Sequence, residues 1–195
     1  MKKIYIFAGC NGAGKTTAFE STLFNTNICN DYLNTDRIAK GISPFNSANV
    51  SIKAGRLLVE QMDELLIAGK TFALETTLSG RAYKHKLEYA KTLDYDIILF
   101  YYWLNSVDLA KERVRLRVKN SGHNVPEEDI ERRYYRGINN LFSLYLPIVD
   151  SAFLYDNSEK PLNLLARFKN NKITIINETK YNQLHNLWTM QNSIK

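Results

Sequence analysis

The stretch KIYIFAGCNGAGKTT, residues 3–17, determines how the rest of the chain is interpreted. Residues 4–8 form an apolar run of β-branched and aromatic side chains, which predicts a short buried strand. The pattern G-x-x-x-x-G-K-[ST] follows directly at residues 9–16, and a helix is expected to begin at Lys15. The stretch therefore predicts a strand, a glycine-rich loop and a helix in direct succession.

The residue types in this loop suit a phosphate group. Glycine lets the backbone curl until successive N–H groups converge on one anion, and the helix N-terminus adds its positive end. The Lys15 ammonium is expected to reach the β- and γ-phosphates of a nucleotide, and the Thr16 hydroxyl is expected to ligate Mg²⁺. The residues predicted to bind nucleotide and metal are Gly9, Asn11, Gly12, Ala13, Gly14, Lys15, Thr16 and Thr17.

Apolar runs alternate with helical patterns along the rest of the chain. Strands are expected at residues 4–8, 71–74, 97–103 and 152–155, with a short strand-like run at 32–35. Helices are expected at 15–23, 48–68, 81–93, 107–119 and 126–146. Near the end, residues 164–169 and 173–176 predict a hairpin around Asn170-Asn171, followed by a helix from Glu178. The pattern predicts an α/β fold with a parallel sheet covered by helices on both faces, and a C-terminal hairpin and helix at about residues 163–195.

Length, charge and cysteine content exclude several classes of protein. The 195 residues and the absence of a linker or repeat predict one domain, residues 1–195. No stretch approaches the ~18 apolar residues of a membrane span. The apolar run after Lys2-Lys3 resembles a short export signal, but such a signal needs an apolar core of ~7–15 residues, and polar Asn11 and Lys15 follow at once. Because Cys10 and Cys29 are too few for a disulfide framework, we expect a cytoplasmic protein.

Other motifs narrow the class of nucleotide-binding protein. The D-x-x-G and N-K-x-D motifs of a GTPase are absent from the sequence. Leu78-Ser79-Gly80 resembles part of a transporter ATPase signature, but the following Gly-Gln is missing and no apolar run ends in Asp. The chain therefore looks like a small ATP-dependent kinase. Such an enzyme needs a base for an acceptor hydroxyl and arginines over the transferred phosphoryl group.

Asp36 and Glu75 are the candidate acidic residues. Asp36 follows the strand-like run at 32–35, where a carboxylate opens into the crevice that binds ligands in parallel sheets. The alternative, an N-cap of a helix, is equally compatible with its position. Glu75 ends a third apolar run and precedes Thr76, Thr77 and Ser79. It could orient substrate hydroxyls or act through Mg²⁺-bound water. The alternative is a turn before the next helix, but Glu is a poor turn residue.

A cluster of arginines predicts a helical hairpin at about residues 106–146 that closes over ATP as a lid. Two basic helical segments flank a Gly-containing turn at residues 120–124, and Pro126 begins the second helix. Guanidinium groups from such a lid can bind the γ-phosphate. We expect two or three of the six arginines in this segment to bind the γ-phosphate. We expect His123 to be a loop residue without a catalytic role. The six are Arg113, Arg115, Arg117, Arg132, Arg133 and Arg136.

The order of motifs along residues 1–177 resembles that of the zeta toxin family of P-loop kinases. The matching stretches are the phosphate loop at 9–16, Asn-Thr-Asp-Arg-Ile-Ala at 34–39, Leu-Glu-Thr-Thr-Leu-Ser at 74–79, Gly-His-Asn-Val-Pro-Glu at 122–127, Arg133-Tyr134, and Tyr-Asp-Asn-Ser at 155–158. The resemblance implies a small-molecule kinase. The best-known zeta toxins phosphorylate the 3′-hydroxyl of the sugar in UDP-N-acetylglucosamine.

The resemblance also implies roles for individual residues. Lys15 and Thr16 would hold ATP and Mg²⁺, and Asp36 would be the base on the acceptor hydroxyl. Glu75 and Thr77 would contact the acceptor. Arg117 and Arg133 would bind the γ-phosphate. In the toxins an Arg stands two positions after the Thr of Glu-x-Thr. Here Ser79 occupies that position and Arg81 lies two residues further on, so Arg81 is the remaining candidate at the acceptor.

The sequence leaves three functional hypotheses. The first is a kinase of a small hydroxylated metabolite such as UDP-N-acetylglucosamine, with a toxin held by an antitoxin as a special case. The second is a nucleotide-switched binding module, for which a base such as Asp36 is unnecessary. The third is a kinase of nucleic-acid ends, suggested by the net charge of +6. Such an enzyme needs a basic groove with exposed aromatic residues, whereas the arginines concentrate in the expected lid. Neither nucleic acid nor a membrane is therefore an expected partner.

Overall fold

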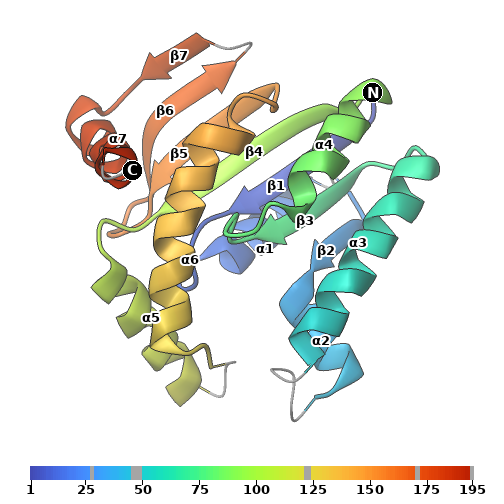
Figure 1. Ribbon diagram of the computed structural model, residues 1–195, viewed down its shortest axis with the longest axis horizontal. Helices are drawn as coiled ribbons and strands as arrows, with labels where there is room; N and C mark the ends of the chain where they lie inside the picture. Colours follow the sequence, from blue (N-terminus) through green and yellow to red (C-terminus); the bar gives the residue numbers. More distant parts are fainter. Residues whose placement is uncertain (27–28, 45–49, 121–123, 170–171, 194–195) are drawn as a thin grey trace.

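The computed structural model describes residues 1–26, 29–44, 50–120, 124–169 and 172–193. Within these ranges no helix is long and apolar enough to cross a membrane. Figure 1 shows the elements in order. They are β1 (Lys3–Ala8), α1 (Lys15–Thr26), β2 (Asp31–Asn34), α2 (Thr35–Ile42), α3 (Ser51–Ile67), β3 (Phe72–Thr76), α4 (Ala82–Thr92), β4 (Asp96–Trp103), α5 (Val107–Lys119), α6 (Glu127–Asn140), the π-helical turn η2 (Leu141–Tyr145), β5 (Ser151–Asp156), β6 (Asn163–Lys169), β7 (Lys172–Ile175) and α7 (Glu178–Asn192).

The strands form one sheet in the order β2-β3-β1-β4-β5-β6-β7. Strands β1 to β5 pair in parallel, whereas β6 and β7 run antiparallel to their neighbours. The α/β fold predicted from the sequence is confirmed, and the C-terminal hairpin extends the same sheet. Because parallel strands end at the same edge, the segments that follow β1, β2, β3 and β4 come together there.

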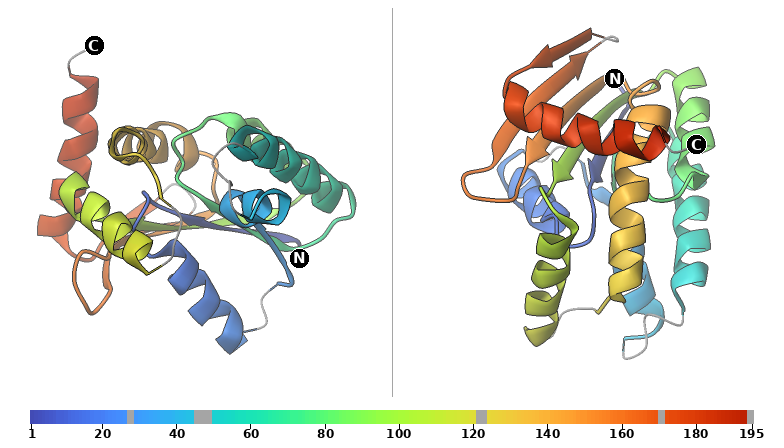
Figure 2. Two further views of the ribbon diagram at one scale, coloured as in Figure 1. Left: turned by 90° about the horizontal axis from the view of Figure 1, so that it is seen from below. Right: turned by 60° about the vertical axis from the view of Figure 1, so that its left-hand side comes forward.

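Helices cover both faces of the sheet, with α1 on one face and α2, α3, α4 and α6 on the other (Figure 2). Three phenylalanines on neighbouring strands show how the α1 face packs. Phe100 of β4 stacks on Phe7 and Phe153, with ring centroids 5.2 Å and 5.4 Å apart. Phe19 of α1 meets Phe7 edge to face at 5.2 Å. This aromatic row fixes α1, and with it the loop before α1, against the centre of the sheet.

Two helical segments differ from the prediction. Residues 35–42 form helix α2, which the periodicity did not reveal, because Asn34 ends β2 and caps the helix by accepting a hydrogen bond from the Arg37 amide. The predicted helix at 126–146 is regular only to Asn140 and continues as a π-helical turn. Asn140 and Tyr145 donate side-chain hydrogen bonds to the carbonyls of Leu78 and Gly80. The predicted hairpin turn at Asn170-Asn171 lies outside the described residues.

Candidate active site

The segment between β1 and α1 forms a tight loop whose glycines are required by its surroundings. Gly9 has φ +145°, and a Cβ there would lie 2.2 Å from the carbonyl oxygen of Tyr102. Gly14 has φ +79°, and a Cβ there would lie 2.7 Å from Nδ2 of Asn157. Any side chain at either position would therefore strain the backbone and push the loop away from β4 or β5. The loop therefore lies close against β4 at Gly9 and against Asn157 at Gly14.

Backbone amides of this loop are available for a ligand. The amides of Gly12, Gly14 and Lys15 donate no hydrogen bond to another described residue. Lys15 as a residue is 7% exposed, and its ammonium donates to the carbonyl of Cys10, 2.9 Å away. Backbone N–H groups without an acceptor in the described chain, beside a buried lysine at a helix N-terminus, favour an anion with several oxygens. This geometry supports the phosphate-binding role that the sequence predicts.

Glu75, at the end of β3, connects the loop to β2. The Thr16 hydroxyl lies 3.1 Å and 2.9 Å from the two carboxylate oxygens of Glu75, and the Lys15 ammonium lies 4.0 Å from Oε1. The Tyr32 hydroxyl donates a hydrogen bond to the same carboxylate, and Asn34 Nδ2 donates to the Tyr32 hydroxyl at 3.0 Å. Burial, together with the nearby charge of Glu75, raises the pKa of Tyr32. The Glu75 carboxylate is therefore held beside the predicted metal ligand.

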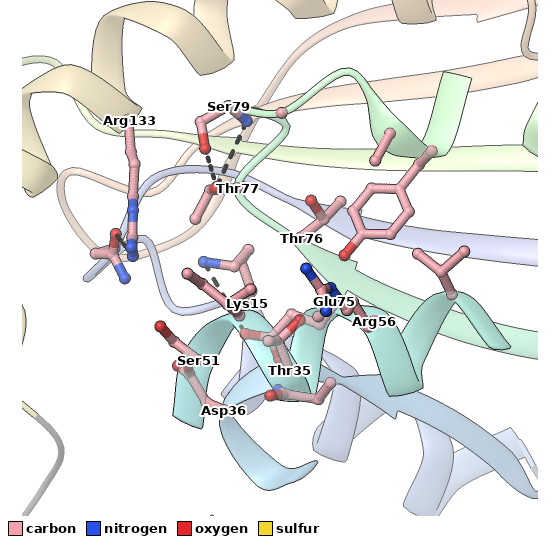
Figure 3. A pocket seen from close by; sticks show the side chains of 18 of the residues that line it. Lys15, Thr35, Asp36, Ser51, Arg56, Glu75, Thr76, Thr77, Ser79 and Arg133 are labelled. Carbon is pink, nitrogen blue, oxygen red and sulfur yellow. Dashed lines mark hydrogen bonds and ion pairs between the residues drawn. The ribbon is translucent and has the colours of Figure 1, made fainter. Parts of the chain in front are cut away.

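A cavity of about 710 Å³ opens beside the phosphate loop, between α2, α3, α6 and the segment after β3 (Figure 3). Asp36, in the first turn of α2, lines it together with Lys15 and Arg133. The N-cap of α2 is Asn34, so the alternative that Asp36 is itself the N-cap is wrong. Asp36 is exposed toward the cavity and therefore remains available to a ligand. The other lining residues are Asn11, Asn34, Thr35, Ser51, Ile52, Gly55, Arg56, Val59, Glu60, Glu75, Thr76, Thr77, Ser79, Gly80, Ala82 and Tyr83.

The segment after β3 forms the far wall of the cavity. The hydroxyls of Thr77 and Ser79 share a hydrogen bond of 2.8 Å, and Thr76 Oγ1 accepts one from the Leu78 amide. The turn that the sequence left as an alternative is thus present, and its hydroxyls still face the cavity. Ser79 lines the cavity, whereas Arg81 is exposed at the start of α4 and is not among the lining residues. The cavity therefore includes Thr77 but not Arg81.

Of the two arginines predicted to bind a γ-phosphate, one lines the cavity and the other does not. Arg133 of α6 lines the cavity, and its Nη1 donates to the Asn11 side chain of the phosphate loop at 3.4 Å. Arg117, on α5, is not among the lining residues. Four residues earlier, Arg113 packs beside Gly12 and donates from Nη2 to the Ser158 carbonyl at 2.8 Å. Arg113 therefore contacts the loop region, a role that the sequence did not assign to it.

The expected lid is partly anchored. Val114 of α5 and Ile130 and Tyr134 of α6 are buried in the core, and the Tyr134 hydroxyl donates to the Leu104 carbonyl at 2.7 Å. A swing of the whole hairpin as one body would expose these side chains, which argues against a lid that includes all of residues 106–146. The turn of that segment, with His123, falls on residues 121–123, which lie outside the described part of the chain.

Residues after β5 support the phosphate loop, which sequence reasoning did not assign. Asn157 Nδ2 donates to the Ala13 carbonyl at 2.9 Å, and the Asn157 amide donates to the Trp103 carbonyl. Asp156 accepts hydrogen bonds from the amide and hydroxyl of Ser158. The stretch at 155–158 was recognised only as part of a motif. The supporting role of Asn157 depends on its contact with Ala13, 144 positions away, which no local pattern contains.

Comparison with known proteins shows one relative by sequence. An uncharacterized protein of Haemophilus influenzae is 30% identical over 132 residues, which are 68% of this chain and 92% of that protein. The chain belongs to the same family. No protein-family model matches it.

Solved structures show the same fold at low sequence identity. A chain of the AvrRxo1-ORF1:AvrRxo1-ORF2 complex, solved with ATP, superposes with a TM-score of 0.76 at 15% identity. The match covers 94% of this chain and 63% of that one, so our chain spans less than two thirds of it. A chain of the PezAT toxin–antitoxin system of Streptococcus pneumoniae gives 0.62 at 14% identity, covering 98% and 86%. A putative kinase from Chloroflexus aurantiacus gives 0.55 at 18% identity, covering 70% and 79%. These solved structures share the fold that the sequence predicts, and that fold is confirmed.

Proposed function

We propose that the protein is an ATP-dependent kinase that transfers the γ-phosphoryl group to a hydroxyl of a small molecule. The observation that carries this proposal is that one cavity is lined by Lys15 of the phosphate loop, by Asp36 and by Arg133. A nucleotide-switched binding module needs no carboxylate facing an acceptor space, whereas a kinase does. The likeness of fold to a complex solved with ATP supports ATP as the nucleotide.

Mg²⁺ fits the residues at the end of the loop. Thr16 presents a hydroxyl and Glu75 a carboxylate within 3.1 Å of it, and oxygen ligands of this kind suit a hard divalent cation. Mg²⁺ commonly binds through one or two protein groups, with water and phosphate oxygens completing its coordination. A bound cation would neutralise charge on the β- and γ-phosphates. Thr16 is the proposed direct ligand.

Each proposed residue has one task in the transfer. The Asp36 carboxylate accepts the proton of the acceptor hydroxyl, which makes that oxygen a better nucleophile. Lys15 and Arg133 bind phosphate oxygens and stabilise the charge that spreads over them in the transition state. Thr77 and Ser79 offer hydroxyls that can orient the acceptor. Such positioning lowers the barrier because the reacting groups no longer have to meet by diffusion.

We propose a nucleotide sugar of the UDP-N-acetylglucosamine type as the acceptor. The cavity volume of about 710 Å³ lies within the range of about 300–1,000 Å³ usual for ligand sites. Arg56 of α3 lines the cavity and makes no hydrogen bond or ion pair with another described residue. Its guanidinium can pair with a diphosphate, for which its fork-shaped set of donors is well suited. The hydroxyls of the far wall suit a sugar.

Incubation of the purified protein with labelled ATP and a panel of nucleotide sugars and other hydroxylated metabolites, charged and uncharged, tests both parts of the proposal. We expect label in a nucleotide sugar, and Asp36→Asn is expected to lower kcat by about 10²–10⁴-fold with nearly unchanged ATP affinity. Arg56→Ala is expected to raise KM for the acceptor much more than KM for ATP. No transfer to any hydroxylated acceptor would contradict the kinase assignment. Transfer only to uncharged acceptors would contradict the nucleotide sugar alone.

We also propose that the chain acts as a toxin held by an antitoxin. The support is its likeness of fold to a chain of the PezAT toxin–antitoxin system. Expression in bacteria without a partner is then expected to arrest growth, and the Asp36→Asn variant is expected not to do so. Equal growth arrest by both proteins would mean that the effect does not come from phosphoryl transfer.

A further inference from the structure

A chain of hydrogen bonds leads from the phosphate loop to helix α2. The chemistry of its groups determines which of them donate and which accept. An ionised carboxylate accepts hydrogen bonds and donates none, so the hydroxyls of Thr16 and Tyr32 must both donate to Glu75. Asn34 Nδ2 in turn donates to the Tyr32 oxygen at 3.0 Å. Because the Thr16 hydrogen is directed at Glu75, both lone pairs of its oxygen face away from the carboxylate. They are free to ligate a cation.

The Tyr32 side chain is held on both faces of its ring. The ring stacks on Phe19 of α1, with centroids 3.6 Å apart and planes 10° from parallel. The Arg37 guanidinium of α2 lies over the ring, 4.9 Å from its centroid, and pairs with Glu20 at 2.6 Å. A ring fixed between two helices gives its hydroxyl a single direction, toward Glu75. The position of the Tyr32 hydroxyl is therefore set by the packing of its ring, and the hydroxyl in turn fixes the Glu75 carboxylate.

Asn34 joins this network to the proposed base. Its Nδ2 donates to Tyr32, while its Oδ1 accepts from the Arg37 amide and caps α2. Asp36 is in the first turn of that helix. Three side chains, those of Glu75, Tyr32 and Asn34, thus connect Thr16, at the cation end of the loop, with the helix that carries Asp36.

We propose that Tyr32 is a positioning residue for the divalent cation: by holding Glu75 against Thr16, it directs the Thr16 oxygen at the cation and keeps a carboxylate beside it. The proposal rests on the Mg²⁺ site of the proposed function. It gives Glu75 a task on the cation side in addition to any contact with the acceptor. Groups that orient a metal ligand in this way typically change metal affinity by about 10–100-fold.

The test measures cation binding directly. Mn²⁺ is titrated into the protein saturated with ADP, and free Mn²⁺ is followed by electron paramagnetic resonance. Tyr32→Phe keeps the ring and its stacking but removes the hydroxyl, and we expect it to weaken Mn²⁺ binding about 10-fold. ADP affinity in EDTA is expected to stay within twofold of wild type, and excess Mg²⁺ is expected to restore turnover.

Tyr155→Phe is the matched control. Tyr155 is a half-buried strand tyrosine stacked on Tyr102 at 5.5 Å, and its hydroxyl bonds to no other described residue. We expect wild-type Mn²⁺ affinity from this variant. Glu75→Gln provides a second measurement and is expected to weaken Mn²⁺ binding at least as much as Tyr32→Phe.

Three results would overturn the proposal: Mn²⁺ affinity of Tyr32→Phe within twofold of wild type, an equal loss of ADP affinity in EDTA, or an equal effect of Tyr155→Phe. The second of these would make Tyr32 a purely structural residue. The kinase proposal fails on a different result. If the wild-type protein binds Mn²⁺ and ADP but phosphorylates no acceptor, the kinase assignment is lost, while the comparison of Tyr32→Phe with wild type still decides the role of Tyr32.

Discussion

Replacing Gly137 with alanine adds one methyl group where α6 crosses the segment after β3. A Cβ at this position would lie 2.6 Å from the carbonyl oxygen of Thr77, a distance that real Cβ atoms do not show. The obstacle is backbone, so it cannot rotate away. Asn140 and Tyr145 fix the same segment by hydrogen bonds to the carbonyls of Leu78 and Gly80. Alanine at 137 must therefore push α6 outward or displace a wall of the cavity.

The sign of the effect follows from two opposing contributions. Alanine in place of glycine inside a helix usually stabilises a protein by about 0.5–1 kcal/mol. Overpacking a rigid site costs about 1–3 kcal/mol. We expect Gly137→Ala to destabilise the protein by about 1–2 kcal/mol, which for a domain of this size lowers Tm by about 2–8 °C. Arg133 lies one turn before Gly137, so the displacement is also expected to lower kcat.

Gly55→Ala is the matched control for stability. Gly55 lies inside α3, and a Cβ there would meet nothing within 4 Å. Without a clash, the helical preference of alanine acts alone, and Tm is expected to rise by about 1–4 °C. Differential scanning calorimetry of the two variants against wild type measures both shifts. If Gly137→Ala melts at or above wild type, as Gly55→Ala should, the close approach of α6 and Thr77 does not constrain the site.

Three further predictions concern the phosphate loop and the arginines. Lys15→Ala is expected to abolish nucleotide-dependent activity with an unchanged circular dichroism spectrum; normal ATP affinity and turnover would remove the role assigned to the loop. Arg133→Ala is expected to lower kcat by up to about 10³-fold, and Arg117→Ala tests the second arginine predicted to bind the γ-phosphate. Arg115→Ala breaks only an exposed ion pair and should have little effect on kcat. Similar steady-state rates for all three variants would refute the role of the arginines at the γ-phosphate. Burial raises the pKa of the Cys10 thiol from 9.0 to about 11, so the stability it contributes is present below pH 9 and is lost as pH rises through 11. Denaturant unfolding of wild type and Cys10→Ala at pH 8 and pH 11 should show a relative loss of about 2–3 kcal/mol for wild type, and parallel pH profiles would contradict the burial argument.

Much of the sheet could be predicted from the sequence because its strands are continuous apolar runs. The run at 97–103 appears in the structure as β4, which is one residue longer, and the phosphate loop follows β1 as expected. Helix α2 was missed because eight residues give too little periodicity. Its strongest signal is Asn34, which serves both as the last residue of a strand and as an N-cap. From the sequence alone, Asn34 does not indicate whether the strand continues or a helix begins, until the pairing of β2 with its neighbouring strand is known.

The candidate site was predictable where a role belongs to a local motif and not where it depends on distant pairing. Lys15, Thr16 and Asp36 were named from their own segments, and the structure brings them to one edge of the sheet. Tyr32 was missed because its hydroxyl meets Glu75, 43 residues away, only after β2 and β3 have paired. The contact of Arg113 was missed for a similar reason. Arg113 lies on α5, and only the folded chain brings its guanidinium to the carbonyl of Ser158.

The contact between Asn157 and the phosphate loop has a consequence for biosynthesis. The loop leaves the ribosome well before its hydrogen-bonded neighbour, which follows 144 positions later. Until β5 has joined β4, a nascent chain contains the complete loop sequence without the side chain that braces Ala13. Contacts between such distant positions form late, since the intervening chain must first be ordered. Translation itself therefore sets a delay between the synthesis of the phosphate loop and the moment at which all of its supporting contacts can form.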